Sequence, residues 1–434
     1  MQKTIIFILS LVALQTQAYT QRGPSGSRSQ SMIREAAPQP TMKLDDVLSA
    51  VATNHPSVKM YDADIRSSDE AAKGARSWEA PELGTGLWMT PYNPSLWKRN
   101  ADGTSGMGQY MVSAQQMIPN KKELDANEKY LRAVSAAGKE SKQANLNELY
   151  ASAKMSYYTW LIAAKKLTVL DDNQKLLQFM IQSTEIRYKN NVGKLNAYYK
   201  AKATLGEIEN QRIQLQNEIT QQQVRLNTLM NRDAGSTFTI DTTYTIKDYS
   251  PADSSYFLQA RSDIKAVQKN IDLVYLQQNL ERTKLKPQFG IRYDHMFGFG
   301  GTPMQYTLMA TVRLPMAAWS SKKAKASIES LTWKEQSLAQ QKQVMINEAT
   351  GQMQGLLAAI ASKKRQVELF EQNILPALHK NYQVLQLGYE QNTGDLFELL
   401  DTWQTLNMTQ MEHLQQVQDL LSLQTEMDKT LQQN

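Results

Sequence analysis

The sequence predicts a mainly α-helical protein with a transmembrane β-barrel portion. Each protomer is expected to hold two internal repeats of long antiparallel coiled-coil helices, with four strands in all. Three observations support this fold class: a helix reversal that occurs twice, heptad-spaced apolar residues on the helices beside it, and two pairs of segments with alternating polarity. The expected order is a short helix, two strands, a long helix, a reversal and a long helix, present twice.

The reversal at residues 388–401 lies between two segments that are almost free of helix breakers. Asn392 and Gly394 let the chain leave the right-handed helical region at low cost. Asp395 can then cap the next helix, with Glu398 as its capping partner. The pattern recurs 201 positions earlier, through the pairs Tyr188/Tyr389, Asn191/Asn392, Gly193/Gly394 and Leu195/Leu396. A second alignment, shifted by 206 positions, matches residues 55–59 with residues 261–265.

The repeats divide the chain into five parts. Residues 1–18 combine one basic residue, a short apolar run and a cleavage site at Ala18, which is typical of a secretory signal peptide. A membrane anchor is the alternative, but the run is shorter than the ~18 residues that span a bilayer. Residues 19–42 form a flexible N-terminal segment, 43–231 the first repeat, 232–251 an irregular linker and 252–434 the second repeat.

Long helices follow the strands in both repeats. One of roughly 65–70 residues, on the order of 100 Å long, is predicted between Pro119 and Tyr188. A shorter helix is expected over residues 42–78, with an interruption near Pro56. The helices after the reversals carry apolar a and d positions, which is typical of coiled-coil packing. These are Leu205, Ile208, Leu215, Ile219, Leu226 and Leu229, then Leu396, Leu399, Trp403, Leu406, Val417, Leu420, Met427 and Leu431.

Four segments alternate between apolar and polar residues: 82–89, 109–118, 289–294 and 306–314. Strands of a membrane barrel show this alternation, and so does a half-buried hairpin of a soluble domain. Four strands cannot close a barrel, since about eight is the smallest usual number. The strands therefore close by oligomerisation, or they do not lie in a membrane.

The composition argues against several classes of function. The chain has no cysteine, which removes disulfides, thiolate metal sites and cysteine nucleophiles. Its net charge of +6 is spread over helices that also carry many acids, as on solvated helix faces rather than a nucleic-acid surface. The histidines His55, His295, His379 and His413 are far apart in the sequence. We expect no enzyme activity, no catalytic residues and no cofactor.

From about residue 43 onward, the chain resembles the TolC-like outer-membrane factors, the outer membrane efflux proteins of Gram-negative efflux and type I secretion systems. The resemblance rests on the starts at residues 54–56 and 261–264, on Pro81 and Pro287 before the strands, and on the two reversals. It implies a homotrimer with a 12-stranded barrel in outer-membrane lipid and an α-helical tunnel in the periplasm. It also implies a periplasmic adaptor protein and an inner-membrane transporter as partners of this exit duct.

A soluble periplasmic coiled-coil scaffold or adaptor protein is the alternative. The chain also departs from the family in two ways. Residues 120–122 and 317–319 replace the Phe-Asp-Gly turn that often follows the strand-ending proline. Without cysteine the chain lacks an acylated N-terminus, so the barrel alone would anchor it.

The resemblance also implies site residues. Glu398 and Asp401 match the acidic rings of the periplasmic pore constriction, where three protomers would bring six carboxylates together and attract cations. The alternative is that these acids complement the helix dipole and complete a cap. The first repeat has Ala197 and Lys200 instead. The tips Asn191, Gly193, Asn392 and Gly394 are the expected surface for adaptor docking.

Methionine is frequent, with 20 residues, and soft thioethers suit Cu(I) or Ag(I). A heavy-metal efflux duct is therefore a further alternative, with His295, Met296 and Met304 as candidate metal ligands near one end of the barrel. Core filling explains methionines on helices equally well. The substrate stays undecided between drug, metal and protein.

Overall fold

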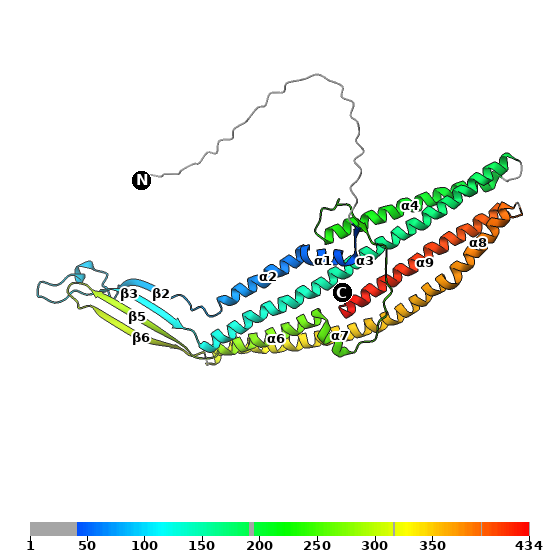
Figure 1. The fold of residues 1–434 in the computed structure, drawn as a ribbon. Helices are drawn as coiled ribbons and strands as arrows, with labels where there is room; N and C mark the ends of the chain where they lie inside the picture. Colours follow the sequence, from blue (N-terminus) through cyan, green and yellow to red (C-terminus); the bar gives the residue numbers. More distant parts are fainter. Residues whose placement is uncertain (1–40, 191–194, 316, 392, 434) are drawn as a thin grey trace, which may run out of the picture. The chain divides into compact units, whose positions relative to one another are not determined.

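The structure is a computed structural model that describes residues 41–190, 195–315, 317–391 and 393–433. The predicted signal peptide and nearly all of the N-terminal segment lie outside these residues. Two pairs of long helices and a four-stranded sheet dominate the described part of the chain (Figure 1). The sheet lies at one end of the helices, and both helix pairs reverse at the other end.

The first half of the described chain contains α1 (Leu44–Asn54), α2 (Pro56–Lys73), β2 (Glu82–Trp88), a 3-10 turn (Pro94–Trp97), β3 (Gln109–Ile118), α3 (Lys121–Lys189) and α4 (Leu195–Leu229). The helix α3 has 69 residues, which confirms its predicted length. The helix expected over residues 42–78 is two helices, because Pro56 opens α2 and His55 Nδ1 accepts the Ser57 N–H at 3.2 Å. It also ends earlier than predicted, at Lys73, with Gly74 as its C-cap.

The second half contains β4 (Thr239–Ile240), α5 (Ser254–Ala260), α6 (Ser262–Thr283), β5 (Gln288–Gly298), β6 (Gln305–Arg313), α7 (Ala318–Leu369), a π-helical segment (Phe370–Ile374), α8 (Leu375–Glu390) and α9 (Leu396–Leu431). The strand β5 runs past its predicted end at residue 294. The linker, predicted to be irregular, contains β4, which pairs in parallel with β1 (Thr41–Met42). Strands of two residues are too short for any alternation that would mark them in the sequence.

The sheet has the strand order β2-β3-β5-β6, and every neighbouring pair is antiparallel. Its central strands, β3 and β5, come from the two halves of the chain, with Tyr110 opposite Phe297 and Ile118 opposite Phe289. Within the described residues, β2 and β6 pair along one edge only. Such an edge presents free N–H and C=O groups to a further strand.

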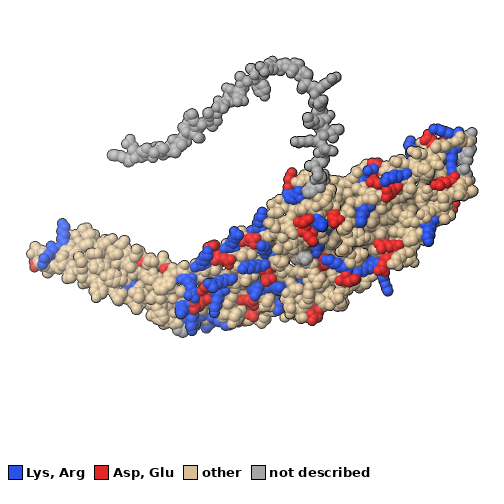
Figure 2. Space-filling view, viewed as in Figure 1, with Lys and Arg blue, Asp and Glu red and all other residues tan. Residues whose placement is uncertain are grey.

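Alternation along the strands separates an apolar face from a polar face. The apolar face is exposed and includes Leu83, Leu87, Tyr110, Val112, Phe289, Ile291, Tyr293, Phe297, Tyr306, Leu308 and Val312. Along β5 it extends from Phe289 to Phe297, about 26 Å at ~3.3 Å per residue. Strands of membrane barrels tilt by about 35–45°, so this length along the strand corresponds to roughly 20 Å across the membrane, somewhat less than the ~25 Å apolar band of such barrels. Figure 2 shows few charged side chains over the sheet, whereas both signs of charge cover the helices.

Two hydrophobic clusters hold the helices together. One includes Leu161 of α3 and Val417 of α9, and the other, nearer the reversals, includes Trp403 at 0 % exposure. Every heptad residue predicted in α9 is buried, and so are Ile208 and Leu226 of α4, which confirms the coiled-coil packing. Among the described helices, none has both the length and the apolar composition needed to cross a membrane.

The π-helical segment lies between two stretches of heptads. Before it, buried residues of α7 follow each other in steps of seven, at Ile346, Met353, Ile360 and Val367. After it, Leu375, Tyr382 and Tyr389 pack into the second cluster, again in steps of seven. The step from Val367 to Leu375 is eight. The wider π turn accommodates this one additional residue, so the same face of the helix stays against its partners.

A buried carboxylate binds the linker to the helices. The Asp428 side chain of α9 is 6 % exposed and accepts from Lys154 Nζ of α3 at 2.9 Å, Lys247 Nζ at 2.8 Å and the Tyr249 hydroxyl at 2.7 Å. Burial raises the pKa of Asp428, but the hydrogen bonds from Lys247, Lys154 and Tyr249 outweigh it and hold this pKa below its usual value. In addition, Gln424 Nε2 donates to the Lys247 carbonyl at 3.1 Å.

Candidate functional site

The reversal between α8 and α9 closes on one carbonyl, that of Gly388. The backbone N–H groups of Thr393 and Gly394 both donate to it at 2.9 Å, and the Thr393 hydroxyl donates at 3.0 Å. A Cβ added to Gly394 would lie 3.0 Å from the backbone nitrogen of Tyr389. The chain leaves the helical conformation at Gly394, as predicted, but the φ of Gly394 is outside the left-handed range. The close approach of two backbone segments explains the glycine.

Asp395 caps α9, as predicted. Its side-chain oxygen accepts the Phe397 N–H at 3.1 Å. Glu398 occupies the position of a capping-box partner, but its side chain makes no hydrogen bond or ion pair with any described residue. The reciprocal capping bond of the alternative explanation is therefore not formed, although the helix dipole still favours an acid here.

Glu398 and Asp401 lie on one exposed face of α9, opposite the buried face formed by Leu399, Leu400 and Trp403. Residues three positions apart project from the same side of a helix. Asp401 makes no side-chain hydrogen bond or ion pair with the described residues either. Both carboxylates are therefore free to face solvent or further copies of the chain.

One basic residue of the other helix pair approaches this region. Lys200 Nζ of α4 lies 5.7 Å from the ring centroid of Phe397, the residue just before Glu398. A cation over an aromatic face is attracted by its quadrupole. Lys200, which the repeat aligns with Asp401, thus contacts the start of α9. The side chain of Ala197 lies outside the described part of the chain.

Arg187 connects the ends of the two helix pairs. Its guanidinium lies 3.8 Å from the ring centroid of Tyr389 and donates a hydrogen bond to the Tyr389 carbonyl. The Tyr389 ring is 4 % exposed, and its hydroxyl lies 3.4 Å from Thr184 Oγ1. The equivalent tyrosine of the first reversal, Tyr188, is 45 % exposed. The sequence reasoning missed Arg187, whose signal is its place one turn before a reversal, where a long basic side chain can reach across.

Three of the four predicted tip residues, Asn191, Gly193 and Asn392, lie outside the described residues. Gly394 lies at the end of the helices that is distant from the sheet (Figure 1).

The candidate metal ligands do not all lie on one face of the sheet. His295 lies on the apolar face of the sheet, where its ring is 4.5 Å from that of Phe297. Met296 is the next residue, so its side chain lies on the opposite face. Met304 is in the loop after β5 and is 70 % exposed. Within the described residues, no group of three or more His, Asp or Glu side chains could hold a metal ion.

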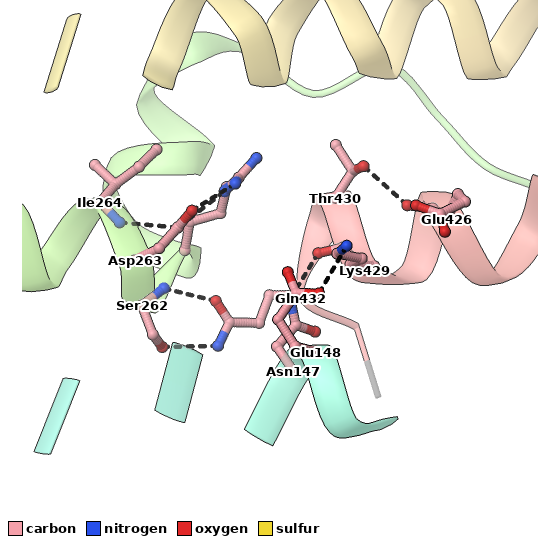
Figure 3. Close-up of polar contacts among 10 residues, drawn as sticks. Asn147, Glu148, Ser262, Asp263, Ile264, Glu426, Lys429, Thr430 and Gln432 are labelled. Atoms are coloured by element: carbon pink, nitrogen blue, oxygen red, sulfur yellow. Dashed lines mark hydrogen bonds and ion pairs between the residues drawn. The ribbon is translucent and has the colours of Figure 1, made fainter. Parts of the chain in front are cut away.

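An open cavity of about 820 Å³ lies where α9 ends beside the start of α6, and α3 and α7 complete its walls. Its polar groups are largely bonded to each other (Figure 3). Gln432 Oε1 accepts the Ser262 N–H at 2.6 Å, and Gln432 Nε2 lies 2.7 Å from Ser262 Oγ. Lys429 pairs with Glu148 at 2.8 Å. We interpret this region as a joint that couples α9 to α6, because Gln432 satisfies an N–H group at the start of α6.

The fold is of one class with that of solved outer-membrane channels. Residues 47–232 match the family model described as outer membrane efflux protein. The resemblance seen in the sequence is thereby confirmed. No match was found among curated proteins.

Three solved structures show the similarity in detail. VceC from Vibrio cholerae has a TM-score of 0.70 at 16% identity, covering 89% of this chain and 95% of its own. CmeC from Campylobacter jejuni has a TM-score of 0.71 at 12% identity, covering 95% and 93%. MtrE from Neisseria gonorrhoeae, in its open state, has a TM-score of 0.70 at 14% identity, covering 89% and 88%. All three are outer-membrane proteins, and the likeness establishes the fold, including the predicted fold class of helices with a small strand portion.

Proposed function

We propose that this chain is one protomer of an outer-membrane exit duct, in a tripartite efflux or type I secretion system. The duct passes substrates from an inner-membrane transporter and a periplasmic adaptor to the exterior. One observation carries this proposal: an exposed apolar face that runs about 26 Å along the strands of a sheet whose edge strands, β2 and β6, are each paired on one side only in the described chain. The family match and the channel folds of the relatives support it.

The duct is a homotrimer. Four strands from each of three copies give 12 strands, enough to close a barrel, and β2 of one copy would pair with β6 of the next. The apolar face then contacts lipid, and the polar face lines the interior. The purified protein in detergent should have a mass near three times 49.2 kDa, less the signal peptides. A monodisperse monomer would contradict the assembly.

Cell fractionation separates the duct from the alternative scaffold. The duct should be found in the outer-membrane fraction and should need detergent for its extraction, whereas a soluble scaffold should be found in the periplasmic fraction. Release into the periplasm without detergent would support the scaffold and refute the duct.

Glu398 and Asp401 are proposed as the constriction of this duct. Their exposed carboxylates have no partner among the described residues, and the capping bond that would explain Glu398 otherwise is absent. Three copies would bring six such groups round one axis, where they attract cations. Lys200, beside Phe397, would moderate this negative field.

The double variant Glu398→Gln/Asp401→Asn tests the constriction. It should lose cation selectivity and block by multivalent cations in planar-bilayer recordings, because every carboxylate of the ring is removed. The variant Glu348→Gln/Glu368→Gln is a matched control, since both acids are exposed on α7 and have no bonded partner in the described chain. Wild-type selectivity in the first variant would assign the two acids to helix stability alone.

The reversals, including Gly394, are proposed as the adaptor-docking tips. They join α3 to α4 and α8 to α9, and the helix ends beside them lie at the end distant from the sheet. The proposal includes Asn191, Gly193 and Asn392 as residues of the same turns. A photo-crosslinking residue at position 391 should capture the adaptor, whereas one at Lys98, in the loop between β2 and β3, should not.

A further inference from the structure

Basic residues are concentrated where the sheet meets the helices. Residues 282–288, from the end of α6 into β5, hold three basic residues and no acid. Residues 313–325, from the end of β6 into α7, hold four and no acid. The two segments lie side by side, because Gln288 pairs with Arg313 across the hairpin. Figure 2 shows blue side chains gathered at this junction. We name these residues the basic collar: Arg282, Lys284, Lys286, Arg313, Lys322, Lys323 and Lys325.

The collar is poorly supplied with acidic partners. Among the described residues only Lys284 forms an ion pair, with Glu281 of its own helix at 2.5 Å. Arg313 donates to the Gln288 side-chain oxygen at 3.4 Å. Lys322, Lys323 and Lys325 are exposed, and no acid of the described chain pairs with them. Their positive charge is therefore available to a partner outside the protomer.

The stability of α7 does not account for these lysines. The helix begins at Ala318 without a side-chain cap and without an acid in its first turn. Cations close to a helix N-terminus oppose the helix dipole. Lys322 and Lys323 lie in the second turn of α7, where their positive charges do not stabilise the helix. An anionic partner near this end would compensate for the charges of both lysines.

An exposed tryptophan lies between the collar and the apolar face. Trp319, in the first turn of α7, is 86 % exposed, and Leu314, just after β6, is 58 % exposed. Phe289, at the start of β5, continues the apolar surface at 55 % exposure. Tryptophan is enriched at the boundary between lipid tails and headgroups, and lysine side chains reach past it toward the headgroups. The order apolar face, Trp319, lysines is the order of layers across one leaflet.

We propose that the basic collar binds the phosphate groups of anionic phospholipids in the membrane leaflet next to the helices. The inference rests on the proposed function, because the duct places the apolar face in lipid. Charge complementarity selects this occupant: seven basic side chains with one acidic partner face a surface that carries one phosphate per lipid. Basic residues at a membrane surface each strengthen such binding roughly fivefold.

Native mass spectrometry of the detergent-purified protein tests the collar. The probe is an equimolar mixture of phosphatidylglycerol and phosphatidylethanolamine with identical acyl chains. The wild-type protein should retain phosphatidylglycerol in preference. In the variant Lys322→Gln/Lys323→Gln/Lys325→Gln, the preference for phosphatidylglycerol should be at least fivefold lower. A fivefold decrease is the loss expected if only one of the three lysines contacts the lipid. Added salt should weaken the preference in the wild type as well.

The variant Lys59→Gln/Lys139→Gln/Lys380→Gln is the matched control. It removes three exposed lysines of α2, α3 and α8 that have no ion pair in the described chain. Its preference should equal that of the wild type, and an equal loss in both variants would reduce the effect to net charge and overturn the collar. Dissociation of the collar variant into monomers would overturn it too, because the lysines would then serve protein contacts.

Channel recordings distinguish this failure from failure of the proposed function. A protein that forms channels but retains both lipids equally refutes the collar alone. A protein that forms no channels in planar bilayers refutes the duct, whatever lipid it retains.

Discussion

Replacing Asp428 by asparagine should release the linker from the helices. The neutral side chain leaves the Lys154 ammonium, which is 5 % exposed, without a counter-charge in the core. Removing one partner of a buried ion pair typically costs about 3–5 kcal/mol. Lys247 is 49 % exposed and can turn to water, so it adds little to that loss. The amide introduced by the substitution keeps some hydrogen bonds, which favours the lower end, about 3 kcal/mol.

Trypsin measures this effect directly, because Lys247 is itself a cleavage site in the linker. If cleavage follows the population of the opened linker, a loss of about 3 kcal/mol should raise its rate at Lys247 about 100-fold. Asp172→Asn is the matched control. Asp172 is 68 % exposed and pairs with Lys175 at the surface, where ion pairs contribute about 0–1 kcal/mol. Equal cleavage rates in the two variants would refute the argument that the buried pair holds the linker.

The same carboxylate predicts a pH dependence. The pKa of Asp428 is lower in the folded protein than in the unfolded chain, so its contribution is present above the unfolded value of about 3.9. It is lost as the pH falls through the lower, folded pKa. The difference in unfolding midpoint between wild type and Asp428→Asn should therefore be constant near neutral pH and shrink below about pH 4. A difference that grows on acidification would contradict the sign.

Three further predictions concern the reversals and the core. Gly394→Val should impair export while trimers persist, because a Cβ there lies 3.0 Å from the backbone nitrogen of Tyr389. Gly351→Ala, whose Cβ meets nothing within 4 Å, should be neutral, and normal export with Gly394→Val would argue against the docking role. Arg187→Lys should increase amide hydrogen exchange at residues 386–391, since a lysine cannot both cover the Tyr389 ring and hydrogen-bond its carbonyl as a planar guanidinium does. Unchanged exchange would show that Arg187 does not stabilise this end of α8. Trp403→Ala should destabilise the protein by about 3–5 kcal/mol, as calorimetry would reveal, and the exposed Trp333→Ala should change stability far less.

Much of the fold could be predicted from the sequence, because the strongest signals in the sequence are periodic. The heptads of α9 marked its buried face, and the alternation of residues 109–118 matched β3 at both ends. The metal candidates show where the same rule was not applied. His295 and Met296 are neighbours in a strand, and a period of two already places their side chains on opposite faces.

Other features depend on contacts that no local pattern encodes. The predicted repeat aligns Tyr188 with Tyr389, yet their environments differ, because Arg187 covers only Tyr389. The role of Glu398 could not be read from its position, since a capping-box pattern does not guarantee that the capping bond forms. The joint between Gln432 and Ser262 joins residues 170 positions apart in the sequence, and no local signal predicts it.

The π-helical segment at Phe370–Ile374 has a consequence for how such a chain can change over generations. A single-codon insertion in a straight coiled coil would rotate every later side chain by about 100° and ruin the packing beyond it. Here the wider turn takes up the odd residue within five positions, and Leu375, Tyr382 and Tyr389 stay in the core. Deleting one residue from this segment should give an unbroken α-helix with the same buried face. Long helical rods of this kind can therefore gain or lose single residues near this point while both of their ends stay in register.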